Sequence, residues 1–188
     1  MPRNKIIILL ALLILVVSVI IIVRNFSQQR KIRPVPILPL TTMQLTSSAF
    51  QNNEHIPSQY TCDGANVNPP LNILEIPKEA ESLVLIVDDP DAPRGDWVHW
   101  TVWNINPTTA SIGENSVPSG AIEGQTDFGK SGYGGPCPPS GTHRYHFKLY
   151  ALDKELALDK RAKKFDLESA MSGHTLAQST LVGLYKRR

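Results

Sequence analysis

The amino-acid sequence predicts a mainly β domain preceded by one N-terminal transmembrane helix. Fifteen prolines and twelve glycines interrupt the apolar runs of the 188-residue chain, which disfavours long helices. Several of the runs alternate apolar and polar residues with the period of a strand. Residues 6–23 differ from the rest, because they contain no charged residue, no Gly and no Pro. The residues from Pro34 onward suffice for one sizeable core and are too few for two domains.

The apolar run over residues 6–23 has the length of a membrane-spanning helix. At 1.5 Å per residue it extends about 27 Å, which just crosses the hydrocarbon core of a bilayer. We therefore expect a basic tail over residues 1–5, a transmembrane anchor over 6–23, a Pro-spaced tether over 24–40 and a globular domain over 41–188. A cleaved signal peptide is the alternative, although the run exceeds the usual apolar region of such peptides. We expect a single-pass membrane protein whose globular domain is extracytoplasmic. Basic residues lie at both ends of the apolar run, so the charge pattern does not decide on which side of the membrane the domain lies.

Charge is unevenly distributed along the chain. All 17 acidic residues follow residue 53, whereas six of the 19 basic residues lie in the first 33 positions. The globular part is therefore weakly acidic and lacks the basic surface that a phosphate backbone requires, so nucleic acid is not an expected partner. An apolar share of 41% excludes a disordered chain.

Three apolar runs predict strands. Residues 82–87 (SLVLIV) form a nearly continuous apolar run that ends at two aspartates, as expected of a buried strand. In residues 98–105, strict alternation places Val98, Trp100 and Val102 on one face and His99, Thr101, Trp103 and Ile105 on the other. In the third run the inward positions are His143, Tyr145, Phe147, Leu149 and Ala151, and His146 faces outward. Only residues 153–171 have a helical pattern, with Asp166 as a candidate cap and Gly173 as the stop.

Residues 124–131 (GQTDFGKS) match the phosphate-binding loop of nucleoside triphosphatases. That loop needs a buried strand before it and a helix after it. The flanking segments SVPSGAIEG and GYGGPCPPSG provide neither, so this motif is rejected.

Three other segments carry side chains suited to chemistry: DPDAP (residues 89–93), WVHW (97–100) and GGPCPPSGTHRY (134–145). Taken singly, they have plain structural interpretations: a turn after a strand, a core histidine and an ordinary loop. Taken together, they place two imidazoles, a carboxylate and a phenol beside strand ends. This combination predicts one small polar cavity rimmed by rigid Gly and Pro backbone.

These segments resemble the signature segments of the phosphatidylethanolamine-binding protein family, in its bacterial and archaeal Raf-kinase-inhibitor-like branch. TCDGANVNPPL (residues 61–71) and AMSGHTLAQSTLVGLYKR (170–187) resemble the opening and closing segments of that branch, so the likeness covers roughly residues 43–187. It implies a β-sandwich with a few short peripheral helices and a small anion pocket. The ligand-binding residues carried over from the family are Asp89, Trp97, His99, Gly135, Pro136, Pro139, His143 and Tyr145.

The resemblance implies non-enzymatic binding of a phosphorylated or other anionic small ligand, such as a lipid headgroup, without a cofactor or metal. Imidazole, phenol and backbone N–H donors suit the acceptor oxygens of a phosphate group. Asp89 is expected to orient a histidine, because two negative charges in contact repel, and Asp91 is expected to be a local turn acceptor. The chain ends shortly after Tyr185, so the kinase-binding surfaces of animal members are not carried over, and no protein partner is identified.

Two other functions remain open. A serine protease inhibitor is one, since some relatives resemble such inhibitors in activity and the chain offers Pro-rich loops. A metal-dependent hydrolase is the other, because His99, His143, Asp89 and Asp91 are metal-ligand types, although no recognised ligand spacing occurs. Cys62 and Cys137 are the only cysteines, and the sequence is compatible with a disulfide or with two buried thiols.

Overall fold

The computed structural model describes Ser18 and residues 42–187 of the chain. The chain divides into two units, Met1–Leu40 and Thr41–Arg188, and the second contains every strand described below.

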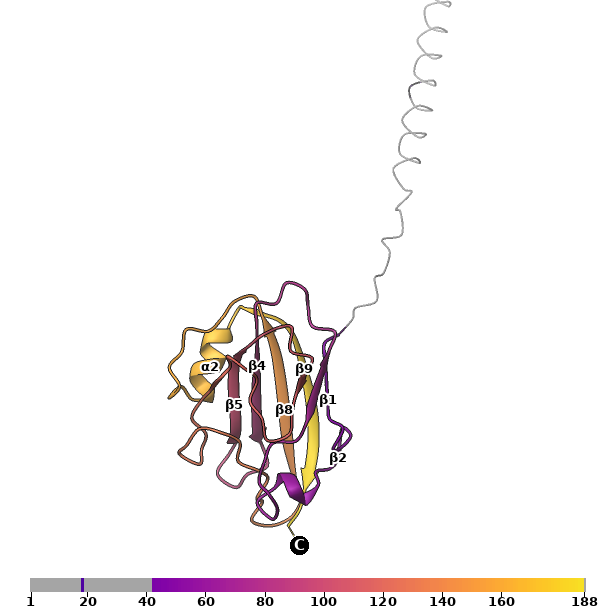
Figure 1. Cartoon of the computed structure of the whole chain (residues 1–188), viewed down its shortest axis with the longest axis vertical. Coiled ribbons are helices and arrows are strands. Elements are labelled where there is room, and N and C mark those ends of the chain that lie inside the picture. Colours follow the sequence, from indigo (N-terminus) through magenta and orange to yellow (C-terminus); the bar gives the residue numbers. More distant parts are fainter. Residues whose placement is uncertain (1–17, 19–41, 188) are drawn as a thin grey trace, which may run out of the picture. The chain divides into compact units, whose positions relative to one another are not determined.

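The second unit is built from two β-sheets. The larger has the strand order β2-β9-β8-β4-β5-β7, and Figure 1 shows its four long strands side by side. Its bounds are β2 Glu54–His55, β4 Ser82–Asp89, β5 Trp97–Ile105, β7 Ile122–Glu123, β8 His143–Leu152 and β9 Thr175–Tyr185. All its pairings are antiparallel except the one between β2 and β9. The smaller, antiparallel sheet has the order β1-β3-β6, formed by Gln44–Thr46, Leu71–Leu74 and Ser111–Ile112.

The two sheets bury one apolar core between them. Leu45 of β1 and Ile73 of β3 belong to the same buried cluster as Leu85, Trp100 and Phe147 of the large sheet. This arrangement is a sandwich, as the family resemblance implied. β4 is buried along its whole length, and β8 buries the positions predicted from its alternation.

Strand β5 departs from the strict alternation predicted for it. Trp100, Val102 and Ile105 all face the core between the sheets, whereas Trp103 packs in a second cluster on the outer face. The register with β4 shifts between Val87 and Asp88 and again between Leu83 and Leu85, and Asn104 has a positive φ of 54°. Each irregularity changes which face the next residue occupies. The prediction that His99 and Ile105 lie on the face opposite Trp100 is therefore wrong.

The outer face of the large sheet is covered by α2 (Lys164–Met171), a shorter helix than the predicted 153–171. Residues before Lys164 are held by bonds to other elements: Asn104 exchanges two hydrogen bonds with the backbone of Leu156, at 2.8 and 3.1 Å. These bonds replace the i to i+4 pattern of a helix. At the helix start, Asp166 accepts the backbone N–H of Lys163, and Gly173 follows the end with a φ of 80°. Besides α2, residues 42–187 contain one 3-10 turn, η1 (Ser58–Tyr60).

The predicted transmembrane helix is not part of the observed fold. The predictions of a fold class that includes such a helix and of a membrane location are therefore wrong. Residues 6–23 lie outside the described residues, except for Ser18, as do the predicted tail and tether. Within the part of the chain that the structure describes, no helix is long and apolar enough to cross a membrane. The 8 residues of α2 extend about 12 Å, against a hydrocarbon thickness of about 30 Å. The observed class is mainly β, with a single α-helix between residues 42 and 187.

Candidate functional site

A cavity of about 300 Å³ lies where the end of β4 meets the starts of β5 and β8. It is lined by Asp89, Ala92, Pro93, Trp97, His99, Phe128, Cys137, Pro138, Pro139, His143 and Tyr145. Six of the eight residues predicted from the sequence therefore line one cavity, and we call this cavity the pocket.

Asp89 and His143 form a buried pair in the pocket wall. Asp89 Oδ2 lies 2.7 Å from His143 Nδ1, and the two side chains are only 5% and 9% exposed. The other carboxylate oxygen, Oδ1, accepts the backbone N–H of Asp91 at 2.9 Å. Asp89 thus orients a histidine, as expected, and also stabilises the turn that follows β4.

Asp91 does not act as the local turn acceptor that the sequence predicted. Its carboxylate accepts from the backbone N–H and the guanidinium of Arg144, at 2.6–2.9 Å. The hydrogen bonds and charge of Arg144 hold the pKa of Asp91 well below its ordinary value. The pair fastens the DPDAP turn to the first residues of β8, and so fixes Asp89 relative to His143.

His99 is buried with one ring nitrogen bonded to the loop before β8. Its Nδ1 lies 2.5 Å from the carbonyl oxygen of Gly134, whose N–H in turn donates to the His99 carbonyl at 2.9 Å. Burial lowers the pKa of His99, and this outweighs the opposing effects of the Gly134 bond and of nearby carboxylates such as Asp89. His99 is therefore a neutral imidazole at pH 7.

Tyr145 places its hydroxyl in the buried part of the pocket. The ring contacts His99 edge-on, with centroids 5.2 Å apart. The hydroxyl oxygen is buried and makes no hydrogen bond of acceptable geometry with the described residues, although Asp89 and the Cys137 backbone lie close enough to affect its pKa. Burial, reinforced by the charge of Asp89, raises the pKa of the phenol, so it stays protonated and available as a donor.

Aromatic and proline side chains form the apolar part of the lining. The Phe128 ring packs edge-on against Trp97 and against His99, with centroids 5.6 and 5.3 Å apart. Sequence reasoning missed Phe128, which lies inside the rejected phosphate-loop motif. Its neighbour Asp127 exchanges two bonds with the backbone of Val98, at 2.7 and 3.1 Å, and thereby brings the loop to β5. An aspartate followed by an aromatic residue in a loop is too general a sequence signal to have identified Phe128 as a pocket residue.

Gly135 and Pro136 are the two predicted site residues that do not line the pocket. They connect the loop that precedes β8, which includes the pocket residues Cys137, Pro138 and Pro139, to the loop of residues 59–66 instead. The N–H of Gly135 donates to Asn66 Oδ1 at 2.7 Å, and Pro136 O accepts from Cys62 N at 3.1 Å. A Cβ on Gly135 would lie 2.6 Å from the carbonyl oxygen of Tyr60, which explains why glycine is needed there.

The same two loops are joined covalently. Cys62 and Cys137 form a disulfide with a Cα–Cα distance of 5.4 Å. Cys137 also belongs to the pocket lining, so the bridge holds one wall of the pocket.

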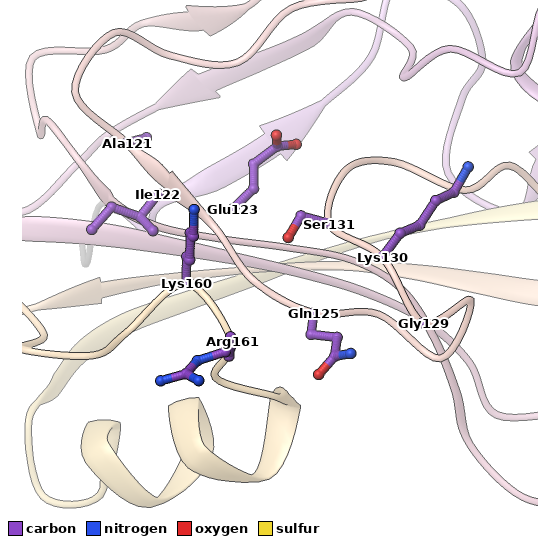
Figure 2. Close-up of a pocket in the computed structure, with 9 residues that line it drawn as sticks. All are labelled: Ala121, Ile122, Glu123, Gln125, Gly129, Lys130, Ser131, Lys160 and Arg161. Carbon is purple, nitrogen blue, oxygen red and sulfur yellow. The ribbon is translucent and has the colours of Figure 1, made fainter.

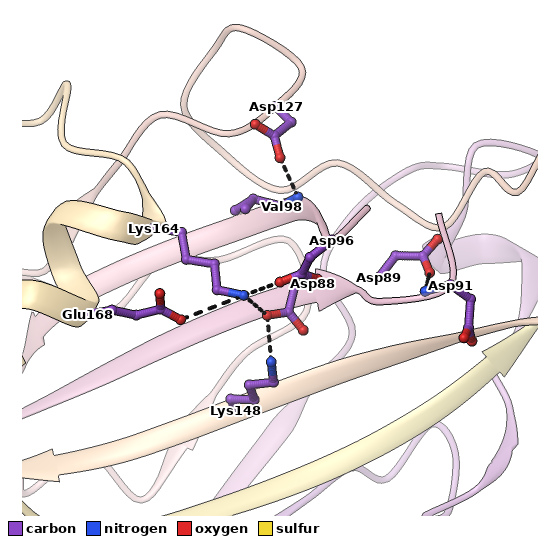
Figure 3. A network of polar contacts seen from close by, with 9 residues as sticks. All are labelled: Asp88, Asp89, Asp91, Asp96, Val98, Asp127, Lys148, Lys164 and Glu168. Carbon is purple, nitrogen blue, oxygen red and sulfur yellow. Dashed lines mark hydrogen bonds and ion pairs between the residues drawn. The ribbon is translucent and has the colours of Figure 1, made fainter. Parts of the chain in front are cut away.

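An ion-pair network lies on the opposite face of β4 from Asp89 (Figure 3). Asp88 is fully buried, and its Oδ2 accepts from Lys148 of β8 at 2.7 Å and from Lys164 of α2 at 2.6 Å. Lys164 also pairs with Asp96, the residue before β5. Burial lowers the pKa of Lys164, but its bonds to Asp88 and Asp96 outweigh this and raise the pKa overall. The network joins the end of β4 to the start of β5 on the other face of the sheet from the pocket.

A second, open hollow of about 540 Å³ lies beside the rejected phosphate-loop motif (Figure 2). Its lining includes Gly129, Lys130 and Ser131 of that motif, together with Lys160 and Arg161. The backbone amides of the motif are used within its own turn: Gly129 N–H donates to Thr126 O, and Thr126 N–H donates to Lys130 O, both at 3.0 Å. They are therefore not directed at a ligand, which agrees with the rejection of the motif.

Comparisons with known proteins identify the family. The family model described as phosphatidylethanolamine-binding protein matches residues 46–186. A UPF0098 protein of Methanothermobacter thermautotrophicus is 50% identical over 150 residues, covering 77% of this chain and 99% of the relative. A UPF0098 protein of Pyrococcus horikoshii is 51% identical over 150 residues, covering 76% of each chain.

Solved structures agree with the sequence relatives. The crystal structure of a phosphatidylethanolamine-binding protein homologue from Chlamydia trachomatis has a TM-score of 0.76 and 42% identity, covering 79% of this chain and 99% of that one. Escherichia coli YbcL, described as a member of the mammalian family of these proteins, has a TM-score of 0.73 and 30% identity, covering 78% and 99%. Fold, pocket segments and relatives therefore lead to one conclusion: the chain belongs to the phosphatidylethanolamine-binding protein family.

Proposed function

We propose that the pocket binds a small anionic group, in particular a phosphoryl group carried by a lipid headgroup or a small molecule, without catalysing a reaction. The observation that carries this proposal is the Tyr145 hydroxyl, which is buried and unpartnered among the described residues. An unsatisfied buried donor costs about 1–3 kcal/mol. A ligand oxygen that accepts from this hydroxyl removes that cost.

The shape and chemistry of the pocket suit such a ligand. Its polar side chains, those of Asp89, His99, His143 and Tyr145, share the cavity with Trp97, Phe128 and three prolines. A few fixed polar groups set in a mostly apolar lining are typical of small-molecule sites. The volume of about 300 Å³ is at the lower end for such sites, which favours a headgroup or a small phosphorylated compound.

Binding is favoured over catalysis by the state of the candidate nucleophiles. Cys137 is the cysteine of the lining, and its sulfur is bonded to Cys62 in the disulfide, so it carries no free thiol. The raised pKa of Tyr145 keeps its oxygen protonated. Of the four metal-ligand types considered for a metal-dependent hydrolase, Asp91 is paired with Arg144, and Asp89 is bonded to His143.

Titration calorimetry of the full-length chain with O-phosphoethanolamine tests the proposal. Removing the hydroxyl with Tyr145→Phe should weaken binding about 10- to 150-fold, the value of a hydrogen bond to a charged group. The same substitution should leave the free energy of unfolding unchanged or raise it, because the hydroxyl is unpartnered in the free protein. His146→Ala, on the outer side of β8, is the matched control and should bind like the wild type. Absence of binding by the wild type, or unchanged binding by Tyr145→Phe, would overturn the proposal.

A further inference from the structure

We infer that the pocket takes a tetrahedral oxyanion in its protonated, singly charged form, with a hydroxyl of the ligand donating to an imidazole nitrogen, and therefore discriminates phosphate esters from sulfate esters. The inference rests on the proposed function and specifies the ligand class of the same site. It follows from which nitrogen of each histidine carries the proton.

The hydrogen bonds at Nδ1 fix the tautomer of both histidines. A carbonyl oxygen only accepts, so His99 Nδ1 must donate to Gly134 O, 2.5 Å away. A carboxylate also only accepts, so His143 Nδ1 must donate to Asp89 Oδ2, 2.7 Å away. In the neutral form of either ring the proton is therefore on Nδ1, and Nε2 carries a lone pair.

The two Nε2 atoms face no protein donor, and in His99, whose buried ring is neutral, this atom is an acceptor. Neither has a hydrogen-bond partner within residues 42–187, and both rings line the pocket. Tyr145 supplies a hydroxyl that can donate. The polar part of the pocket thus offers the His99 Nε2 lone pair as an acceptor and the Tyr145 hydroxyl as a donor, which complements a ligand that carries its own O–H.

The charge of the pocket lining also favours a singly charged, protonated ligand. The pocket lining contains neither Lys nor Arg, and its formally charged side chain is Asp89. A dianion would enter without a Lys or Arg to meet it and would face Asp89 and the Nε2 lone pair of His99. A phosphate monoester with one proton carries a single negative charge and one donor, whereas a sulfate ester is ionised and has no proton to donate.

Other charged groups around the imidazoles do not change this assignment. The titratable and charged groups near the two rings come from three strands and two loops. They are Asp88 and Asp89 of β4, Arg144 and Tyr145 of β8, Tyr185 of β9 (the register partner of His143), and the loop residues Asp91 and Asp127. For His99, burial lowers the pKa more than the surrounding carboxylates raise it. The Arg144 charge is neutralised by Asp91. Neutral His99 is thus an acceptor over the physiological range.

A pair of isosteric esters provides the test. The full-length chain is titrated with O-phosphoethanolamine and with ethanolamine O-sulfate at pH 6 and pH 8. The phosphate ester should bind at least tenfold more tightly than the sulfate ester at pH 6. Since its second pKa is about 6, its singly charged form falls about fifty-fold between pH 6 and pH 8, and its affinity should fall accordingly.

Each outcome decides the matter. Equal affinity for the two esters, or phosphate-ester affinity that does not change between pH 6 and pH 8, overturns the inference while leaving the proposed function intact. A sulfate ester that binds as tightly as the phosphate ester with the same pH dependence would mean that a protonated histidine supplies the donor, and also overturns it. Failure of both esters to bind refutes the proposed function and this inference with it.

Asp89→Asn provides a second, independent test. The amide oxygen can still accept the Asp91 N–H, which turns the amide NH₂ toward His143 Nδ1. The imidazole proton must then move to Nε2, so the pocket gains a donor and loses a negative charge, as in the corresponding substitution in catalytic triads. The preference for the phosphate ester should shrink at least tenfold, whereas His146→Ala should keep the wild-type ratio. An unchanged preference in Asp89→Asn would overturn the inference.

Discussion

Breaking the Cys62–Cys137 disulfide should destabilise the domain mainly through its unfolded state. The bridge closes a loop with a sequence separation of 75 residues. The chain-entropy relation for a loop of that length gives about 4.5 kcal/mol at 25 °C, and engineered removals often lose less, so we expect about 2–4.5 kcal/mol. The folded state should persist, because the Gly135 N–H bond to Asn66 and the Cys62 N–H bond to Pro136 join the same loops without the disulfide.

Urea unfolding of a Cys62→Ser/Cys137→Ser double variant measures this effect. Both cysteines are exposed, so serine is tolerated at each position. With a denaturant slope of about 2 kcal/mol per molar, the midpoint should fall by about 1–2 M, and the slope should rise because the unfolded chain exposes more surface. Reduced wild-type protein should match the double variant. A loss below about 1 kcal/mol, or a difference between the reduced wild type and the variant, would refute the reasoning.

Three further predictions concern the supports of the pocket. Gly135→Ala should cost about 1–3 kcal/mol in urea unfolding, because its Cβ would lie 2.6 Å from Tyr60 O. Lys164→Met should cost about 2–4 kcal/mol, because it removes one of two cations from the fully buried Asp88. The lowered pKa of His99 contributes stability above the unfolded pKa near 6.5 that is lost as the pH falls through the folded value, so His99→Gln should lose less stability between pH 7 and pH 5 than the wild type.

Matched control substitutions separate these specific effects from a non-specific loss of stability. A Cβ on Gly113 would meet Ser116 at an ordinary 3.5 Å, so Gly113→Ala should change the free energy of unfolding by less than about 0.5 kcal/mol. Lys163 is exposed, and Lys163→Met should be similarly neutral. If either control is as destabilising as its partner, or if His99→Gln keeps the wild-type pH slope, the corresponding prediction fails.

Regular periodicity made part of this structure predictable. Strand β8 pairs with β4 and β9 in nearly unbroken antiparallel register, so alternation correctly placed Tyr145 and Phe147 inward. Strand β5 was predicted less well, because its bulge inserts a residue that alternation cannot reveal. His99 therefore reached the pocket on the same face as Trp100, although the pattern had separated the two.

Tertiary contacts explain the other differences. Residues 153–163 have a helical composition, yet the bonds between Leu156 and Asn104 hold that segment to the sheet. Asp91 was expected to cap its own turn, but Arg144 offers a stronger, charged partner. Phe128 reaches the pocket through a loop whose position depends on Asp127, and such long-range placement leaves no periodic trace in the sequence.

The central claim, that the two pocket histidines hold the anionic group, is tested most directly by calorimetry of three alanine variants with O-phosphoethanolamine. His99 and His143 line the pocket, whereas His146 lies on the other side of β8. His99→Ala should weaken binding about 10- to 150-fold, corresponding to about 1.5–3 kcal/mol for a hydrogen bond with a charged partner. His143→Ala should weaken binding at least tenfold, because it also removes the partner of Asp89 and leaves that carboxylate facing the anion. His146→Ala should change affinity less than about twofold. Equal affinities for all three variants, or a loss confined to His146→Ala, would contradict the account.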